Sequence, residues 1–341
     1  MERNKRVDWV DAAKGTGILL IIGAHSIRPD MREAQMVCKF IYDLIDSVAI
    51  GMFIVLAGVT YRMSGSWSTA RPGRFLYKKV RTLLFPFLGY ALLIYVLFSF
   101  AAWYPVTAKI FRGTEYAGMA FREYLWLTLF ADSPYAAHLW FIWVLFWVTI
   151  VVYICDLLCR CWKLPNQKVL WLVAGVFYVI GSLGWRGNSI VQRVLTHMIY
   201  FVYGTEFSIH SEMLKHDSIC SKAAVALSAV AMMGHDSIGW HAVSWYGGVL
   251  WQVCWLAVQL ILIWGTMCLA VRLKGMKWLA YFGRESFWIY LLHQPFCCGF
   301  VGLLLYSRLG LTIPLVCTVC ILLGLLLPLC AVRLGRWALR R

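Results

Sequence analysis

Residues 11–29, DAAKGTGILLIIGAHSIRP, form an apolar run that carries a lysine near its start and a histidine near its end. A run of this length is about what a helix needs to cross the roughly 30 Å hydrocarbon layer of a bilayer. Ionisable side chains are costly inside that layer and usually have a function there. Lys14 and His25 therefore raise two questions: whether the chain spans a membrane, and what these side chains do in it.

The composition of the whole chain answers the first question. Of its 341 residues, 61% are hydrophobic and only 14% are charged, and the mean hydropathy is +0.70. Soluble globular domains contain about 25% charged residues. Apolar runs of about 17 to 25 residues recur along the chain, which is the length of membrane-crossing helices and not the short alternating pattern of a transmembrane β-barrel. The sequence predicts an all-α, polytopic membrane bundle.

The lengths of these runs predict about ten transmembrane helices. We expect one integral-membrane domain over residues 1–341, because the longest pieces between the runs are only residues 62–81 and 103–135. Residues 124–131, YLWLTLFA, are apolar but too short to span, which indicates an interfacial or re-entrant element. The predicted helices cover residues 12–28, 37–61, 82–102, 136–158, 168–184, 192–209, 222–239, 246–271, 285–306 and 311–333.

The net charge of +16 is compatible with a nucleic-acid partner, so the placement of the basic residues has to decide. With a cytoplasmic N-terminus, most of the 32 basic residues fall in segments on the cytoplasmic side. This bias is the positive-inside rule of membrane proteins, and it predicts that both termini are cytoplasmic. The basicity therefore reflects topology, and no nucleic-acid partner is expected.

Lys14 and His25 are predicted to share one face of the first helix. They are eleven residues apart, close to three helical turns, which places them roughly 16 Å apart along the axis. Lys14 then lies near the cytoplasmic surface and His25 toward the outer leaflet. The alternative interpretation is that Lys14 reaches the interface with its long side chain and that His25 only bonds a neighbouring helix.

A basic cluster lies at the predicted cytoplasmic start of the third span. The stretch FLYKKVRTLLFPF, residues 75–87, contains Lys78, Lys79 and Arg81. Such a cluster can bind phosphate groups. It is also what an ordinary positive-inside flank looks like, and the sequence alone leaves both interpretations open.

Two more stretches place histidines in spans. PYAAHLWFIWVLFW, residues 134–147, has His138 and Trp140 at the predicted outer boundary, where an aromatic belt also accounts for the indole. GRESFWIYLLHQPF, residues 283–296, runs from Glu285 to His293. Each feature alone is explained by packing or by topology.

Together these stretches resemble the acyltransferase family 3 membrane proteins. The family's first-helix signature is similar to the pattern of Asp11, Lys14, Gly15 and His25, in which ten residues separate Lys14 from His25. The stretch DAAKG resembles the fucose 4-O-acetyltransferase-like subgroup. KKVR, residues 78–81, is similar to the family's RxxR element, with Lys78 in place of the first arginine. The stretches HLWFIWVLF, YFVYGTEFS and SFWIYLLHQPF resemble its later motifs, so the likeness covers essentially the whole chain.

The resemblance implies a membrane-embedded O-acyltransferase. Such a protein takes an acyl group, usually acetyl, from cytoplasmic acyl-CoA and delivers it to a hydroxyl of a cell-surface glycan or lipid-linked sugar. It also implies a multi-pass protein of the bacterial plasma membrane. No metal is expected.

The resemblance also implies roles for the residues quoted above. His25 is the expected catalytic residue, as a general base for the acceptor hydroxyl or as a transient acyl carrier. The CoA phosphates are assigned to Lys14, Lys78, Lys79 and Arg81. The residues expected to shape the acceptor side are His138, Trp140 and His293. The residues expected to orient basic partners are Asp11 and Glu285.

A small permease or glycan exporter is the alternative function, and a membrane scaffold is a third. A permease is expected to show repeated halves and paired carboxylates near the midplane. The intramembrane acidic residues here are few, and Asp43, Asp46 and Asp156 cannot be paired from the sequence. A scaffold leaves the spacing of Lys14 and His25 unexplained. The sequence does not determine which acceptor is used, whether the acyl group is acetyl or succinyl, or what the oligomeric state is.

Overall fold

The computed structural model describes residues 7–111, 118–130, 132–133, 136–183, 189–209, 214, 219–234 and 245–338. All regular structure in these ranges is helical, as the composition predicts. Parts of the predicted segments 103–135, 168–184 and 222–239 lie outside the described residues.

The chain divides into two compact units. Unit 1 is Met1–Thr60 with Tyr203–Arg341, and unit 2 is Tyr61–Val202. The boundaries fall inside α3 (Met36–Met63) and α11 (Ser189–Ile209). The single domain predicted for residues 1–341 stays a prediction. The remaining helices of unit 1 are α1 (Asp8–Ser26), α2 (Pro29–Ala34), α12 (Ile219–Gly234), α13 (Trp245–Arg272), η5 (Leu273–Gly275), α14 (Lys277–Leu292), η6 (His293–Phe300), η7 (Leu303–Arg308) and α15 (Ile313–Ala338).

Unit 2 consists of shorter helices around α9 and the greater part of α11. Its helix α9 contacts α10, α4 and η1, and α6 contacts α7 and α8. The helices are α4 (Ser66–Thr69), α5 (Pro72–Lys79), η1 (Val80–Leu84), α6 (Phe85–Trp103), α7 (Pro105–Phe111), α8 (Phe121–Leu129), η2 (Ala137–Leu139), α9 (Trp140–Cys161) and α10 (Asn166–Ser182).

Each of the ten predicted segments coincides with helix in the described residues. Within the described residues, 6 helical stretches are able to cross a membrane by length and hydropathy. The number of ten spans and the orientation of the termini therefore stay predictions. The six stretches are Met36–Met63, Pro72–Trp103, Ala137–Cys161, Leu250–Gly275, Lys277–Arg308 and Ile313–Ala338.

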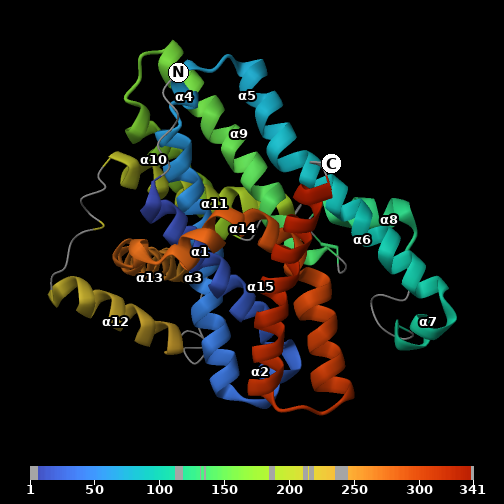
Figure 1. The fold of residues 1–341 in the computed structure, drawn as a ribbon. Helices are drawn as coiled ribbons and strands as arrows, with labels where there is room; N and C mark the ends of the chain where they lie inside the picture. The colour runs from blue at the N-terminus through green and yellow to red at the C-terminus, as the bar shows by residue number, and fades with distance from the viewer. Residues whose placement is uncertain are drawn as a thin grey trace. The chain divides into compact units, whose positions relative to one another are not determined.

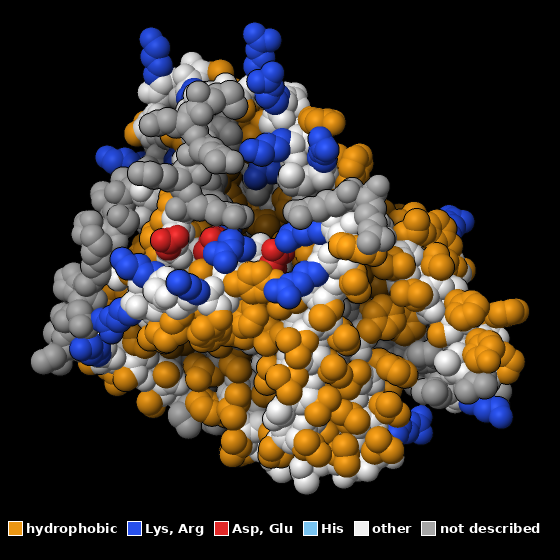
Figure 2. Space-filling model, in the orientation of Figure 1, with side chains coloured by type: hydrophobic (Ala, Val, Ile, Leu, Met, Phe, Trp, Pro, Cys, Tyr) orange, Lys and Arg blue, Asp and Glu red, His pale blue; other side chains and the backbone are white. Residues whose placement is uncertain are grey.

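Large apolar side chains cover the outer surface of these stretches. On α15, Leu322 and Leu326 are 50% and 54% exposed, and Figure 2 shows a broad hydrophobic surface where Figure 1 draws α15. In water, an apolar area of this kind marks an interaction surface. On helices of this length the surrounding hydrocarbon of a bilayer is the natural contact, and the chain is a multi-pass membrane protein.

Helix α1 is packed most closely against α14, and the two lie side by side in Figure 1. Glycines permit this approach: a Cβ on Gly15 would overlap the backbone carbonyl of Leu279, and a Cβ on Gly283 would overlap the carbonyl oxygen of Asp11. Small residues at such crossings let the two backbones come together in a membrane. The DAAKG stretch thus fixes α1 against α14 through Gly15.

Substituting Gly283 with alanine should destabilise this crossing. The added methyl group meets backbone and not a flexible side chain, so the helices must separate, at a cost of about 1–3 kcal/mol, as in other overpacked cores. Gly335→Ala on α15 is the matched control, because nothing lies within 4 Å of a Cβ there. Thermal unfolding of the purified variants in detergent measures the difference. Equal melting temperatures for Gly283→Ala and Gly335→Ala would show that the close crossing is wrong.

Unit 2 contains a buried ionic network that the sequence did not reveal. The carboxylate of Asp156 on α9 is fully buried, accepts a hydrogen bond from the Tyr61 hydroxyl (2.5 Å) and lies 3.6 Å from Nη1 of Arg62. Nη2 of Arg62 donates to the side chains of Asn166 (3.1 Å) and Gln167 (3.0 Å) on α10. The network therefore joins the end of α3 to α9 and α10.

Candidate functional site

Two histidines that are far apart in the sequence meet in unit 1. The ring of His25, in the last turn of α1, lies 5.1 Å from the ring of His293, centroid to centroid, with the planes inclined by 51°. His293 is fully buried, and His25 is half-buried. Nδ1 of His293 lies 2.6 Å from the carbonyl oxygen of Tyr290. A carbonyl only accepts, so Nδ1 carries the proton, and Nε2 of His293 is the basic nitrogen in the neutral ring.

The local sequence explains why His293 sits where it does. The residue before a proline avoids helical backbone angles, and Gln294, before Pro295, has φ −119° and ψ 153°. The regular helix α14 therefore ends just before His293. Close packing of α15 holds the region from another side, because a Cβ on Gly324 would come within 2.9 Å of the Ile22 side chain and 3.8 Å of the Cβ of His293.

Arg32 and Tyr42 are further neighbours that sequence reasoning did not identify, and with them interacts Asp46, an acidic residue that could not be paired from the sequence. The guanidinium of Arg32 on α2 lies over the Tyr42 ring, 3.9 Å from its centroid. Arg32 also interacts electrostatically with His25 and with Asp46. The only signal in the sequence was a charged residue shortly after the first span. A fixed positive charge beside the imidazole is suited to stabilise negative charge that develops during a reaction.

A network of hydrogen bonds connects the segments that follow the two histidines. Nε of Arg28 donates to Asp30 (3.1 Å), Nη1 of Arg28 donates to the Gly299 carbonyl (3.4 Å), and the Ser307 hydroxyl donates to Asp30 (2.8 Å). Burial by itself raises the pKa of Asp30, but the hydrogen bonds from Arg28 and Ser307 outweigh it and the pKa lies below its ordinary value. At neutral pH Asp30 is therefore a carboxylate that accepts these hydrogen bonds. Their contribution to stability is lost only as the pH falls through the lowered pKa of Asp30.

The remaining predicted residues of unit 1 lie along α1 and α14. Lys14 is half-buried on the same continuous helix as His25, as the spacing predicts. The backbone of Asp11 lies at the crossing with Gly283. Glu285 is buried and accepts two hydrogen bonds, each 2.8 Å, from the guanidinium of Arg336 on α15. Glu285 thus forms a bidentate ion pair with a basic residue of α15, and its role in orienting such partners stays a prediction.

The predicted phosphate cluster lies in unit 2. Lys78 and Lys79 end α5, and Arg81 follows in η1. Lys78 and Arg81 are exposed, whereas Nζ of Lys79 lies 5.5 Å from the centroid of the Phe75 ring. Phe75 is buried and stacks on Tyr153 at 3.9 Å. Lys78 and Arg81 are therefore exposed cations at the end of α5 and in η1, and Lys79 is half-buried beside them.

His138 and Trp140 also belong to unit 2 but have different surroundings. His138 is buried and faces Tyr90, with ring centroids 6.0 Å apart. Trp140, on the first turn of α9, lies 4.4 Å from the guanidinium carbon of Arg193 and 5.4 Å from the His197 ring. Arg193 and His197, both on α11, are neighbours that sequence reasoning missed, because polar residues at the start of a span resemble an ordinary flank.

Among the described residues, no group of three His, Cys, Asp or Glu side chains is placed to hold a metal ion. The described residues thus form a multi-pass helical membrane protein in which the His25 and His293 rings meet inside unit 1. The family model for the acyltransferase domain matches residues 7–333, and the chain belongs to this acyltransferase family 3. The likeness to the fucose 4-O-acetyltransferase-like subgroup stays a prediction. Comparison with curated proteins and with solved structures gives no match.

Proposed function

We propose that this protein is a membrane-embedded O-acyltransferase that moves an acyl group, acetyl in the first instance, from cytoplasmic acyl-CoA to a hydroxyl of an extracytoplasmic glycan or lipid-linked sugar. The observation that carries the proposal is His25, paired with His293 inside unit 1 of a chain from an acyltransferase family. In this proposal both termini are cytoplasmic, about ten helices span the plasma membrane of a bacterium, and no metal takes part.

His25 acts as the general base. It removes the proton of the acceptor hydroxyl while the hydroxyl oxygen attacks the thioester carbonyl. The new carbon–oxygen bond forms, the carbon–sulfur bond breaks, and the proton passes from His25 to the departing thiolate of coenzyme A. The nearby cation of Arg32 stabilises the oxyanion of the tetrahedral intermediate. A transient acyl group on His25 is the alternative course of the same reaction.

Lys78, Lys79 and Arg81 bind the phosphates of the acyl donor in this proposal, and Lys14 is a further candidate for the same role. An exposed cationic surface attracts phosphate and is free to make charge-assisted hydrogen bonds to it. The lysine at position 78 offers a point charge where an arginine would offer a planar fork. His138, Trp140 and His293 serve the acceptor, and Asp11 and Glu285 orient basic neighbours.

Radiolabelled acetyl-CoA tests the proposed function. Membranes that contain the protein should transfer label to a surface glycan or lipid-linked sugar, in a form that mild base releases as acetate, because an O-acetyl ester is labile to base. Membranes that lack the protein are the control. Absence of transfer from acetyl-CoA and from other acyl-CoA donors would reject the enzyme and favour the permease or scaffold.

Removing the cationic groups of the phosphate cluster should weaken donor binding and spare the chemistry. The double substitution Lys78→Ala with Arg81→Ala is expected to raise the KM for acetyl-CoA about tenfold, with kcat little changed, because lost binding contacts with the phosphates appear in KM. Arg74→Ala removes an exposed charge from the same helix and is the matched control. An unchanged KM in the double variant, or an equal effect of Arg74→Ala, would show that the cluster does not bind the donor and reflects only membrane topology.

A further inference from the structure

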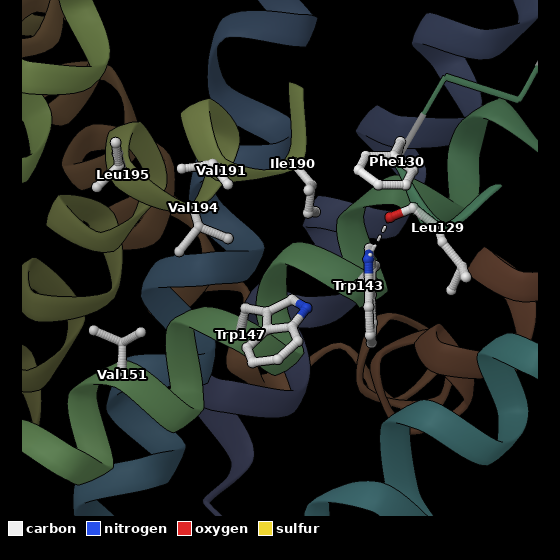
Figure 3. A pocket seen from close by; sticks show the side chains of 9 residues that line it. All are labelled: Leu129, Phe130, Trp143, Trp147, Val151, Ile190, Val191, Val194 and Leu195. Atoms are coloured by element: carbon white, nitrogen blue, oxygen red, sulfur yellow. Dashed lines mark hydrogen bonds between the residues drawn. The ribbon is translucent and has the colours of Figure 1, made fainter. Parts of the chain in front are cut away.

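Unit 2 contains an apolar cavity of about 460 Å³, a volume within the range of about 300–1,000 Å³ that is usual for ligand pockets. Figure 3 shows side chains from three segments converging on it: the end of α8 with the residue that follows, the middle of α9, and the first turns of α11. The lining residues are Leu129, Phe130, Trp143, Trp147, Val151, Ile190, Val191, Val194 and Leu195.

The lining side chains offer almost nothing to a polar ligand. Trp143 and Trp147 have the only polar side-chain atoms among them, and the indole N–H of Trp143 already donates to the carbonyl oxygen of Leu129 at 2.8 Å. A sugar or a nucleotide buried here would lose its hydrogen bonds to water without replacement. The apolar lining of the cavity therefore favours a hydrocarbon ligand.

The cavity opens to the side of a membrane-length helix. Trp147 and Val191 on its wall are each 40% exposed, whereas Ile190 is 8% exposed. The stretch Ala137–Cys161, which includes Trp143, Trp147 and Val151, is one of those able to span the bilayer. A ligand that enters from the surrounding lipid is consequently already in hydrocarbon, and a single alkyl or isoprenyl chain has the shape for a cavity between helices.

A polar group lies on the same two helices that supply most of the cavity wall, α9 and α11. Trp140 is one turn before Trp143 on α9, and Arg193 lies between Val191 and Val194 on α11. The guanidinium carbon of Arg193 is 4.4 Å from the Trp140 ring centroid, and the His197 ring packs on Trp140 as well. A half-exposed cation held on an indole attracts an anionic lipid headgroup. The two features together suit an amphiphile.

We infer that this cavity binds the hydrocarbon chain of a lipid that carries the acceptor, with the charged linkage of that lipid beside Arg193 and Trp140. The inference rests on the proposed function, and it selects a lipid-linked sugar from the acceptors that the sequence leaves open. The start of α9 and the start of α11 are both predicted to face the outer side, where the acceptor is expected.

Two measurements test the inference on the full-length protein in membranes. The first is photolabelling with a long-chain alkyl diazirine, followed by mapping of the labelled residues. The second is acetyl transfer from labelled acetyl-CoA to the lipid-linked glycans of a membrane extract, compared with the same glycans released from their lipid by mild acid. Val194→Phe and Val151→Phe fill the cavity from different helices, and Val176→Phe on the exposed face of α10 is the matched control.

We expect label on the cavity residues, preference for the lipid-linked glycans, and an about tenfold loss of both labelling and transfer in either filling variant, as when about two methylene groups lose their burial. Labelling that is unchanged in both filling variants, or equal use of lipid-linked and released glycans by the unaltered protein, would overturn the inference. Transfer to released glycans alone would overturn it and leave the proposed function standing. Labelling of the cavity without transfer to any acceptor would reject the proposed function and the inference with it, and would leave only a site for a hydrocarbon chain.

Discussion

Replacing His25 with alanine is expected to lower the rate of acyl transfer by about 10²- to 10⁴-fold, the contribution typical of a positioned general base. The ring is half-buried beside His293 and supplies the nitrogen that accepts the acceptor's proton in our proposal. The loss should appear in kcat and equally in kcat/KM for acetyl-CoA, because the interaction exists only in the transition state. Initial rates of label transfer, at equal protein content of the membranes, measure it.

Lys39→Ala is the control for His25→Ala. Lys39 forms an ion pair with Asp43 at 3.2 Å on the exposed surface of α3, and it has no role in the proposed reaction. Its loss should leave the rate within twofold or so, as exposed pairs contribute little. A rate for His25→Ala close to that of Lys39→Ala would remove His25 from the mechanism.

Replacing Asp156 with alanine is expected to cost unit 2 about 3–5 kcal/mol of stability, the usual result of leaving one partner of a buried ion pair alone. Arg62 is only 7% exposed and would lose its counter-ion, and Tyr61 would lose its hydrogen-bond acceptor. Chemical or thermal unfolding in detergent measures the change. Asp43→Ala, which breaks an exposed pair, should cost no more than about 1 kcal/mol.

A second variant separates the predicted loss of the ion pair from a general failure to fold. In Asp156→Leu combined with Arg62→Met both charges are gone, and apolar replacements of a buried pair are often neutral or stabilising. The double variant should therefore be more stable than Asp156→Ala. A double variant as unstable as Asp156→Ala, or an Asp156→Ala protein as stable as Asp43→Ala, contradicts the ionic network.

The helices were largely predictable from the sequence because the pattern that specifies them is local. Apolar runs of membrane length coincide with helix in each predicted segment, and the run at residues 11–29 correctly placed Lys14 and His25 on one helix, α1. That the two side chains share one face stays a prediction. In the piece before the third predicted span, helix begins at Pro72, because proline is well tolerated at a first helical position.

Contacts between distant segments were not predictable from one sequence. His25 and His293 were each predicted to be functional residues, but nothing local indicates that their rings meet. The same is true of Glu285 with Arg336 and of Asp156 with Arg62, which depend on how helices pack and not on their own patterns. Arg32 and Arg193 were missed because a single charged residue next to a span gives no local indication of the distant side chains that it will meet.

The central claim is that His25 serves a transfer from a donor on the cytoplasmic face to an acceptor on the other face. Sealed membrane vesicles of known orientation, with labelled acetyl-CoA supplied to one face only, test it most directly. We predict that acetate is incorporated into the glycan of the opposite face only when the donor is on the cytoplasmic face, and that His25→Ala abolishes the incorporation. Incorporation from a donor on the outer face alone, or full incorporation by His25→Ala, would contradict the claim.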